Sequence, residues 1–205
     1  GRRGAALWRR TCIALLLAAG VLAPFTTTAI PAPPSPVSRL AAGMFLVSQE
    51  QIRDPRFQRT VILITAHNVH GTMGLIINRP TSLPLHEALP HVQVLHDHDE
   101  PLFIGGPVGQ HSLFALIRSH TPPQDGLQIM AGTYFVEGLS GLKAVLAVHD
   151  PETAMRAFVG YTGWEAGQLK AEIDRGDWLV VGADSSAIFD KDPASVWSEL
   201  MRRFG

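Results

Sequence analysis

Two apolar segments separated by a short polar turn lie in the first half of the chain. Residues 60–66 (TVILITA) are almost all aliphatic or β-branched, a pattern typical of a strand buried on both faces. Residues 67–71 (HNVHG) follow, and their asparagine and glycine tolerate the positive φ of a tight turn. Residues 72–78 (TMGLIIN) then predict a returning strand. We therefore expect a β-hairpin here, which requires at least part of the sheet to be antiparallel.

The remaining pattern alternates short strands with scattered helices. Further strands are predicted at 44–48, 101–104, 111–119, 128–136, 154–161 and 177–182, and helices at 82–89, 138–148, 164–175 and 193–204. The sequence GGPVGQ connects strands 101–104 and 111–119 as a second hairpin-like unit. The helix at 82–89 would begin with Ser82 as its cap and Pro84 in its first turn. This order favours an α+β domain with a mixed, largely antiparallel sheet over a doubly wound α/β fold.

The chain begins with a basic, then apolar, then proline-rich stretch. Four arginines in the first ten residues precede a segment with only apolar or glycine side chains (12–23). As a helix this segment would be about 18 Å long, short of the roughly 30 Å hydrocarbon core, so it predicts a signal peptide and no membrane span. We expect a leader at 1–29, a proline-rich linker at 30–39 and a single domain at 40–205.

Two locations are compatible with this beginning. A cleaved leader predicts an exported, periplasmic protein without a stable membrane anchor after cleavage. The alternative is that codons upstream of a wrongly assigned start have been translated, in which case the protein is cytoplasmic.

Charge and cysteine content exclude several classes of protein. The chain has 17 basic and 18 acidic residues; without its first 36 residues, 13 basic residues remain against 18 acidic ones, a formal charge of −5. Such a body is a poor ligand for nucleic acid, so no direct nucleic-acid binding is expected. The single cysteine, Cys12, can form neither an internal disulfide nor a multi-cysteine zinc site.

The sequence contains no complete catalytic or cofactor motif. His86-Glu87 is followed by His91 with three residues between glutamate and histidine, where a zincin helix needs two. There is no phosphate-binding glycine loop and no nucleophile elbow, so no cofactor is predicted. Residues 96–100 (HDHDE) are a dense group of potential ligands. A solvated acidic loop is the favoured interpretation, and no metal site is assigned.

Three loops carry glycines, an amide with an arginine, or aromatic side chains with amides, and they supply most of the candidate ligand-binding residues. At 105–106 two glycines would expose backbone N–H groups to an anion or a carbonyl oxygen, or they form a plain tight turn. At 160–169 (GYTGWEAGQL) aromatic and amide groups line a small-ligand pocket, or the aromatic rings hold a helix on the sheet. Arg79 binds an anion or anchors a loop. The candidates are Asn68, Asn78, Arg79, Gly105, Gly106, Tyr161, Trp164 and Gln168.

Several ordered motifs resemble the bacterial YqgE/AlgH family. They are DPRFQRTV at 54–61, HNxxGxMGLIINRP at 67–80, GGPV at 105–108, GYTGWxxGQLxxE at 160–172 and WLV at 178–180. The resemblance spans about Leu40 to the C-terminus and implies an α+β fold whose bifurcated sheet closes into a pseudo-barrel with flanking helices. The family is often labelled a transcriptional regulator, and it provides no catalytic residues to carry over. Thr162, where alanine is usual, and the loop at 96–100 depart from its pattern.

Four hypotheses about function follow. The leading one is a non-enzymatic, regulatory protein that binds a small molecule or a peptide. The second is a hydrolase-like enzyme using His67, Asn68 or Asp54 beside the GGPV turn, which requires these side chains to lie within hydrogen-bonding reach of one another. Metal binding at 96–100 is the third hypothesis, and direct contact with DNA, as the family label suggests, is the fourth.

Overall fold

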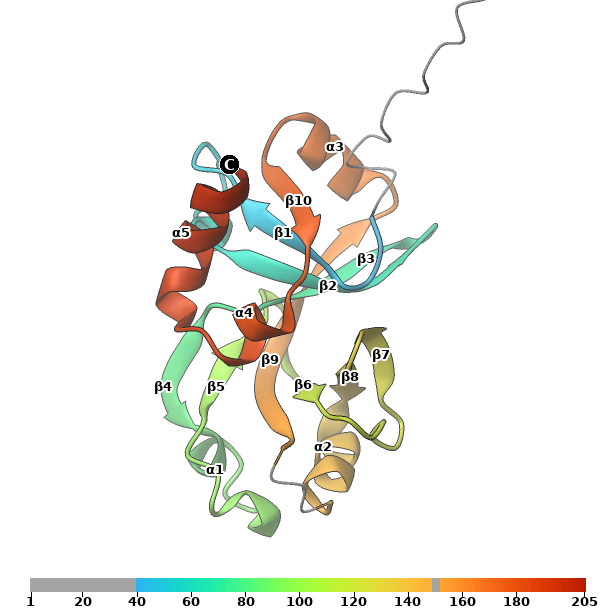
Figure 1. The fold of residues 1–205 in the computed structure, drawn as a ribbon, viewed down its shortest axis with the longest axis vertical. Coiled ribbons are helices and arrows are strands. Elements are labelled where there is room, and N and C mark those ends of the chain that lie inside the picture. Colours follow the sequence, from blue (N-terminus) through green and yellow to red (C-terminus); the bar gives the residue numbers. More distant parts are fainter. Residues whose placement is uncertain (1–39, 149–151) are drawn as a thin grey trace, which may run out of the picture. The chain divides into compact units, whose positions relative to one another are not determined.

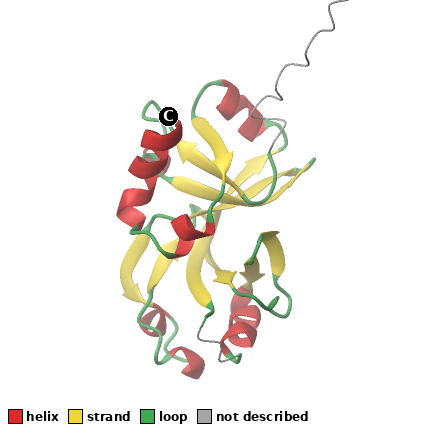
Figure 2. Ribbon diagram, viewed as in Figure 1, coloured by secondary structure: helices red, strands yellow, loops and turns green. Residues whose placement is uncertain are grey.

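The computed structural model describes residues 40–148 and 152–205. Within these residues, ten strands form one branched sheet and five α-helices pack around it (Figure 1, Figure 2). The predicted leader at 1–29 and linker at 30–39 lie outside the described residues. In the described part of the chain, no helix is both long enough and apolar enough to cross a membrane.

The sheet is largely antiparallel, as predicted. Its strands are β1 (Met44–Ser48), β2 (Val61–Asn68), β3 (Gly71–Ile76), β4 (Pro80–Pro84), β5 (Pro101–Ile104), β6 (Val108–Arg118), β7 (Leu127–Met130), β8 (Thr133–Glu137), β9 (Ala154–Glu165) and β10 (Trp178–Gly182). The order along the main path is β10-β1-β2-β3-β9-β6-β8-β7, and β4 pairs with β5, which also pairs with β9. The β5–β9 pair is parallel. This arrangement confirms the α+β class.

β2 and β3 form the predicted hairpin. Residues 61–64 are fully buried, so β2 is covered on both faces, as its apolar sequence predicts. Asn68 pairs with Gly71, which leaves Val69 and His70 as the loop between the strands. Asn68 Oδ1 accepts a hydrogen bond from the backbone N of His70 at 2.8 Å, and this bond closes the turn.

β9 is the strand at which the sheet divides (Figure 1). Residues 162–165 pair with β3, the preceding part pairs with β6, and Phe158 and Val159 also pair with β5. Gly105, directly after β5, lies at the division. Its backbone N donates to Val159 O at 2.8 Å, and its O accepts from the N of Ile76 at 2.8 Å. The bifurcated sheet implied by the family resemblance is therefore present.

Most helices lie around the outside of the sheet, while one short helix lies near the middle of the view (Figure 2). They are α1 (Leu85–Ala88), α2 (Gly138–Leu146), α3 (Gln168–Asp174), α4 (Ser185–Phe189) and α5 (Pro193–Phe204). α5 has the predicted bounds and begins with Pro193, and Asp192 Oδ1 caps it by accepting from the N of Ala194 at 3.0 Å. Trp197 on its buried face donates from Nε1 to Ser48 O at 2.8 Å, which ties α5 to β1.

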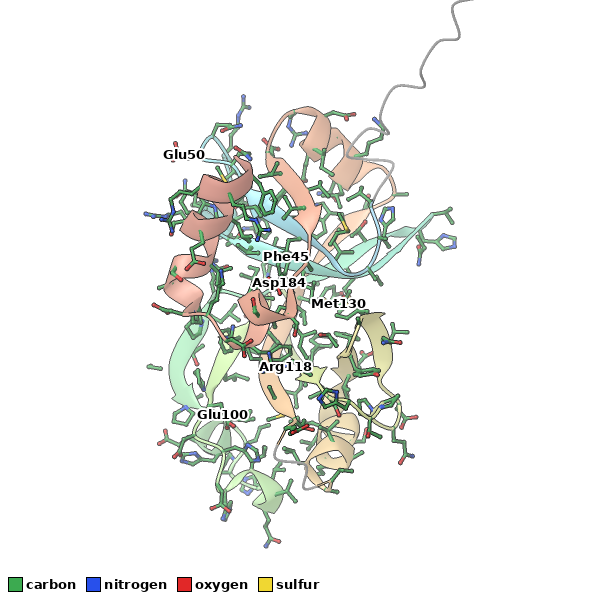
Figure 3. The ribbon with its side chains drawn as sticks, in the orientation of Figure 1. Phe45, Glu50, Glu100, Arg118, Met130 and Asp184 are labelled. Atoms are coloured by element: carbon green, nitrogen blue, oxygen red, sulfur yellow. The ribbon has the colours of Figure 1, made fainter. Side chains whose placement is uncertain are left out.

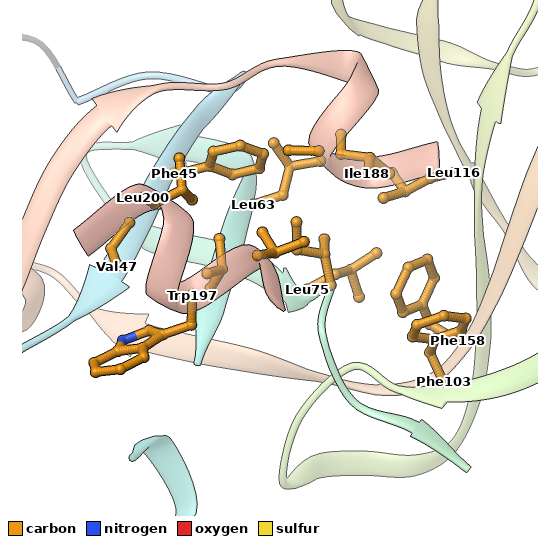
Figure 4. Packing of buried hydrophobic residues seen from close by; sticks show 14 of the residues in the cluster. Phe45, Val47, Leu63, Leu75, Phe103, Leu116, Phe158, Ile188, Trp197 and Leu200 are labelled. Carbon is orange, nitrogen blue, oxygen red and sulfur yellow. The ribbon is translucent and has the colours of Figure 1, made fainter. Parts of the chain in front are cut away.

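The largest hydrophobic cluster fills the inside of the curled sheet (Figure 4). Phe45 of β1, Leu75 of β3 and Phe158 of β9 meet side chains of α4 and α5 there. The sheet curls so far that a side chain at Gly43, just before β1, would lie 2.5 Å from the carbonyl oxygen of Ile129 in β7. Strands near opposite ends of the sheet order thus come together in a half-barrel, in agreement with the implied pseudo-barrel.

The second predicted hairpin is wrong. β5 and β6 do not pair with each other, because β9 lies between them, parallel to β5 and antiparallel to β6. Gly105 and Gly106 carry the chain across β9. A Cβ on either glycine would lie 2.3 Å from backbone atoms of Gly160 or Tyr161. β9, which comes much later in the chain, occupies the position beside β5 that the local sequence pattern assigns to β6.

The helix predicted at 82–89 begins later than expected. Residues 80–84 form β4 and pair with β5 instead. Pro84 restricts the preceding Leu83 to an extended conformation, so a helix cannot begin before it. α1 therefore starts at Leu85, and Ser82 does not cap it.

Two further segments also differ from their predictions. A turn at Gly132, with φ of +67°, divides the strand predicted at 128–136 into β7 and β8. The helix predicted at 164–175 begins only at Gln168, because β9 continues through Trp164 and Glu165. The first boundary is a local turn at a glycine, whereas the second depends on the pairing of β9 with the distant strand β3, which no local propensity reports.

Candidate functional site

A hollow with a volume of about 660 Å³ lies between the β2–β3 hairpin and the junction of β9 with α3. We call it the hairpin hollow. Its lining residues are Ala66, Asn68, His70, Gly71, Thr72, Met73, Val108, Tyr161, Gly163, Trp164, Glu165 and Gln168. The hairpin supplies the first half of this lining, and β9 with the start of α3 supplies most of the rest.

The hairpin hollow brings together four of the eight candidate residues, namely Asn68, Tyr161, Trp164 and Gln168. Tyr161 is half-buried, and its ring packs edge-on against Phe114 with the centroids 5.9 Å apart. Trp164 is only 7% exposed. Both aromatic residues therefore pack on the sheet and also line the hollow, so the two interpretations considered for them are compatible.

Glu172 of α3 joins these candidates to the layer beneath them. Its Oε2 accepts hydrogen bonds from Nε1 of Trp164 and of Trp178, each at 2.8 Å. Its Oε1 accepts from Gln168 Nε2 at 3.1 Å, and Gln168 Oε1 accepts from the backbone N of Glu165 at 3.1 Å. The carboxylate thus holds α3 against β9 and β10. Sequence reasoning missed this role, although the spacing of Gln168 and Glu172 on a helix is a signal for side-chain contact.

A second hollow, with a volume of about 380 Å³, shares Val108, Gly163, Trp164 and Gln168 with the first. We call it the arginine hollow. Its lining residues are Ile52, Arg53, Asp54, Arg56, Phe57, Pro107, Val108, Gly163, Trp164, Gln168, Glu172, Arg175, Asp177 and Trp178. The strand end at Gly163 and Trp164 therefore borders both hollows.

Most charges of the arginine hollow are already paired. Arg56 Nη2 donates to Asp54 Oδ2 at 2.7 Å, and this hydrogen bond holds the pKa of Asp54 below its ordinary value. Arg175 Nη2 donates to Asp177 Oδ2 at 2.5 Å. Arg53 is exposed and makes no ion pair with any described residue. The hollow consequently offers one guanidinium that is not already neutralised.

Asn78 and Arg79 lie outside both hollows and secure a loop. Asn78 Oδ1 accepts from the N of Val61 at 2.8 Å, and its Nδ2 donates to Arg59 O at 2.9 Å. Arg79 Nη2 donates to Gln58 O at 3.4 Å, and burial lowers the pKa of its guanidinium. These contacts match the loop-anchoring alternative considered for Arg79.

Gly105 and Gly106 also lie outside both hollows. The N–H of Gly105 is already used by Val159 O, so this group is not available to an anion. Both glycines are required by the close approach of their backbone to Gly160 and Tyr161. Their position at the division of the sheet accounts for the GGPV motif in structural terms.

His67, Asn68 and Asp54 do not form the catalytic group that the hydrolase hypothesis requires. His67 Nδ1 lies 2.7 Å from Thr72 Oγ1, Asn68 bonds within its own turn, and Asp54 pairs with Arg56. Within the two described ranges, no hydrogen bond connects any two of the three residues.

The segment 96–100 lies beside α1, where Glu100 is labelled in Figure 3. His98 Nδ1 is 3.1 Å from Glu100 Oε2, and His86 Nδ1 is 3.3 Å from Asp99 Oδ1. Among the residues that the structure describes, no group of three or more His, Cys, Asp or Glu side chains is arranged to hold a metal ion. His98 and Glu100 thus pair within the loop, and Asp99 pairs with His86 of α1.

The described residues thus form an α+β half-barrel with a divided sheet and two adjoining surface hollows. A family model described as AlgH-like matches residues 45–205. The chain belongs to the AlgH-like family, as its sequence motifs indicate.

Relatives and solved structures agree with this assignment. A UPF0301 protein of Mycobacterium leprae is 35% identical over 169 residues, which cover 80% of this chain and 83% of that protein. The solution structure of the AlgH protein from Pseudomonas aeruginosa matches with a TM-score of 0.65 and 33% identity, covering 80% of this chain and 88% of that one. A crystal structure of a Corynebacterium diphtheriae protein matches with a TM-score of 0.69 and 28% identity, covering 80% and 87%.

Proposed function

We propose that this protein is a non-enzymatic, regulatory binding protein whose ligand, a small molecule or a peptide, occupies the hairpin hollow. One observation carries the proposal. Asn68 from the β2–β3 hairpin lines the same hollow as Tyr161, Trp164 and Gln168, which come from a distant part of the chain. Each of these four side chains can donate or accept a hydrogen bond or stack on a ligand.

The size and lining of the hollow support a binding role. Its volume of about 660 Å³ falls within the range of roughly 300–1,000 Å³ that is usual for small-molecule sites. Asn68 and Gln168 provide amides, Tyr161 an aromatic face and Met73 an adaptable apolar surface. Such a lining suits a ligand that has both apolar and hydrogen-bonding groups. The separate local partners of His67, Asn68 and Asp54 favour binding over catalysis.

Thermal-shift screening of the full chain against metabolites and short peptides tests the proposal. We expect at least one compound to raise the melting temperature, since a ligand at about 100 times its Kd adds roughly 2.7 kcal/mol to the free energy of unfolding. Calorimetry should then show that Gln168→Ala and Asn68→Ala each weaken binding of that compound by about tenfold, the loss expected for one hydrogen bond.

Gln93→Ala is the matched control, because Gln93 is an exposed glutamine outside both hollows. It should bind the compound as the unmodified chain does. Failure of every compound to stabilise the protein, or unchanged affinity in both hollow variants, would exclude the hairpin hollow as the site.

A further inference from the structure

One edge of β9 is left uncovered at its C-terminal end. β3 covers the other edge, with Met73 opposite Gly163 and Thr72 opposite Trp164. On the opposite edge, the pairing of β6 with β9 ends at the pair Val108–Tyr161. In the described part of the chain, no strand pairs with Gly163–Glu165 on this side. Gly163 and Glu165 are both exposed.

The hydrogen-bonding groups of Gly163 point toward this uncovered edge. In an antiparallel pair, residues alternate between facing their partner strand and facing away from it. Met73 O faces β2, where it accepts from Thr65 Oγ1 at 3.3 Å, so the Met73–Gly163 pair is not bonded across β3 and β9. Glu165 N likewise faces away from β3, since it donates to Gln168 Oε1. The N–H and C=O of Gly163, two residues earlier, therefore share this direction.

The uncovered edge lies between the two hollows. Gly163, Trp164, Val108 and Gln168 line both the hairpin hollow and the arginine hollow. Successive side chains of an extended peptide point to opposite faces. A peptide strand on this edge would therefore place alternate side chains in alternate hollows.

Charge indicates which side chain the arginine hollow would accept. Its three carboxylates are all engaged: Asp54 by Arg56, Asp177 by Arg175, and Glu172 by two indoles and an amide. Among the three arginines of the hollow, Arg53 alone makes no ion pair with a described residue. A carboxylate on the ligand can therefore pair with Arg53, whereas the acids of the hollow already accept hydrogen bonds from their neighbours.

We infer that the ligand is an extended, acidic peptide that adds as a strand to the edge of β9 at Gly163. This inference rests on the proposed function and specifies its ligand. The N–H and C=O of Gly163 pair with the peptide backbone, and one peptide side chain enters the hairpin hollow. A neighbouring carboxylate enters the arginine hollow and pairs with Arg53. The uncovered edge spans only Gly163–Glu165, because Val108 limits it at one end and the side chain of Gln168 at the other. This length suits one short peptide segment better than the edge of a second sheet.

The first test uses the full chain and a phage-displayed library of random heptapeptides. We expect selected peptides to carry an aspartate or glutamate. Methylating the backbone nitrogens of a selected peptide one at a time should weaken binding at least about tenfold at alternate positions and have little effect between them, because only alternate N–H groups face β9.

The second test changes the protein. Gly163→Pro removes the N–H and places a ring at the edge, where proline is tolerated because this N–H bonds to no neighbouring strand. Gly163→Ala is the matched control, since its Cβ would lie an ordinary 3.4 Å from Tyr161 Cε2 and the N–H remains. We expect the proline variant to lose peptide binding at least about tenfold and the alanine variant to retain it. Arg53→Gln should weaken acidic peptides selectively, whereas Arg203→Gln on α5 should not.

The outcomes separate this inference from the proposed function. A library without binders, or an N-methyl scan without alternation, would overturn strand addition, while small-molecule stabilisation of the hairpin hollow would leave the proposed function intact. The N-methyl scan uses the unmodified protein and therefore decides the matter even if Gly163→Pro fails to fold. The library could also select no peptide while the protein forms a dimer that Gly163→Pro dissociates. In that case the strand that adds to this edge comes from a second copy of the chain, and the peptide proposal is overturned.

Discussion

Glu172 is the side chain on which the geometry of the candidate site depends. Its carboxylate is the shared acceptor for the indole N–H groups of Trp164 and Trp178 and for the amide of Gln168. Both indoles are nearly buried, at 7% and 4% exposure, so water cannot readily replace the carboxylate. A buried donor without an acceptor costs roughly 1–3 kcal/mol. Loss of this one group would therefore affect the strand end and α3 together.

We predict that Glu172→Ala lowers the free energy of unfolding by about 2–4 kcal/mol, because two indole donors lose their acceptor at once. Urea unfolding followed by tryptophan fluorescence measures the change. Glu165→Ala removes an exposed carboxylate from the adjoining hairpin hollow and should change stability by less than about 0.5 kcal/mol. Equal stabilities of the two variants would show that the indoles find other acceptors.

At the scale of elements, the crossing of Gly105–Gly106 over β9 determines where the sheet divides. A Cβ at Gly105 would lie 2.3 Å from Gly160 O and 2.9 Å from Leu75 Cδ2, and the oxygen belongs to the backbone of β9. Gly182, at the end of β10, has nothing within 4 Å of the corresponding position.

We predict that Gly105→Ala destabilises the protein by about 1–3 kcal/mol, the usual cost of overpacking, while Gly182→Ala stays within about 0.5 kcal/mol. Thermal and urea unfolding of both variants provide the measurement. A Gly105→Ala protein with unchanged stability would mean that β5 and β9 can separate at no cost, which contradicts the close crossing.

The connection between β6 and the segment after α4 should make stability sensitive to acid. Arg118, labelled in Figure 3, donates to Asp190 from Nη1 at 2.7 Å and from Nη2 at 2.8 Å. This hydrogen bonding, with weaker attraction from Arg156, holds the pKa of Asp190 below its ordinary value. A lowered native pKa stabilises the fold above the unfolded value of about 3.9 and ceases to do so as the pH falls through the native pKa.

We therefore predict that Asp190→Asn is less stable than the unmodified chain at pH 5–7 and that the difference shrinks below about pH 4. Urea unfolding at a series of pH values measures it. Asp97→Asn, which changes an exposed aspartate without a partner in the described chain, should show no such pH-dependent difference. A difference for Asp190→Asn that persists unchanged below pH 3 would argue against the ion pair as its source.

Local sequence patterns predicted the elements whose boundaries depend on local chemistry. The helix at 193–204 begins with a proline and a capping aspartate, and the strands at 44–48 and 101–104 are bounded by turn residues; all three have the predicted bounds. The β5–β6 connection and the start of α3 were predicted wrongly because β9 decides both, and its partners are distant in the sequence. The candidate site divides in the same way. Tyr161, Trp164 and Gln168 all line the hairpin hollow. Asn78 lies outside it and donates a hydrogen bond to the backbone O of Arg59.

At the scale of the whole molecule, five of the twelve lysine and arginine side chains in the described residues form ion pairs with acidic neighbours. The described ion pairs of lysine and arginine are Arg56–Asp54, Arg118–Asp190, Lys170–Asp174, Arg175–Asp177 and Lys191–Glu199. Beyond residue 36 the chain carries 13 basic and 18 acidic residues. Phosphate binding requires unpaired cations on one face, and ion pairing already engages five of these side chains. The net negative charge beyond residue 36 therefore disfavours a nucleic-acid partner.

We predict that the full chain does not bind duplex DNA through its backbone phosphates. Fluorescence anisotropy of a labelled duplex should stay constant in 50 mM salt up to about 100 µM protein, since a net-negative surface gains nothing from counterion release. Kd values in the micromolar range that weaken steeply between 50 and 200 mM salt would contradict the prediction. In that case, repeating the titration with a chain lacking residues 1–36 would show whether the four arginines of that segment are responsible, because their removal leaves the −5 body alone.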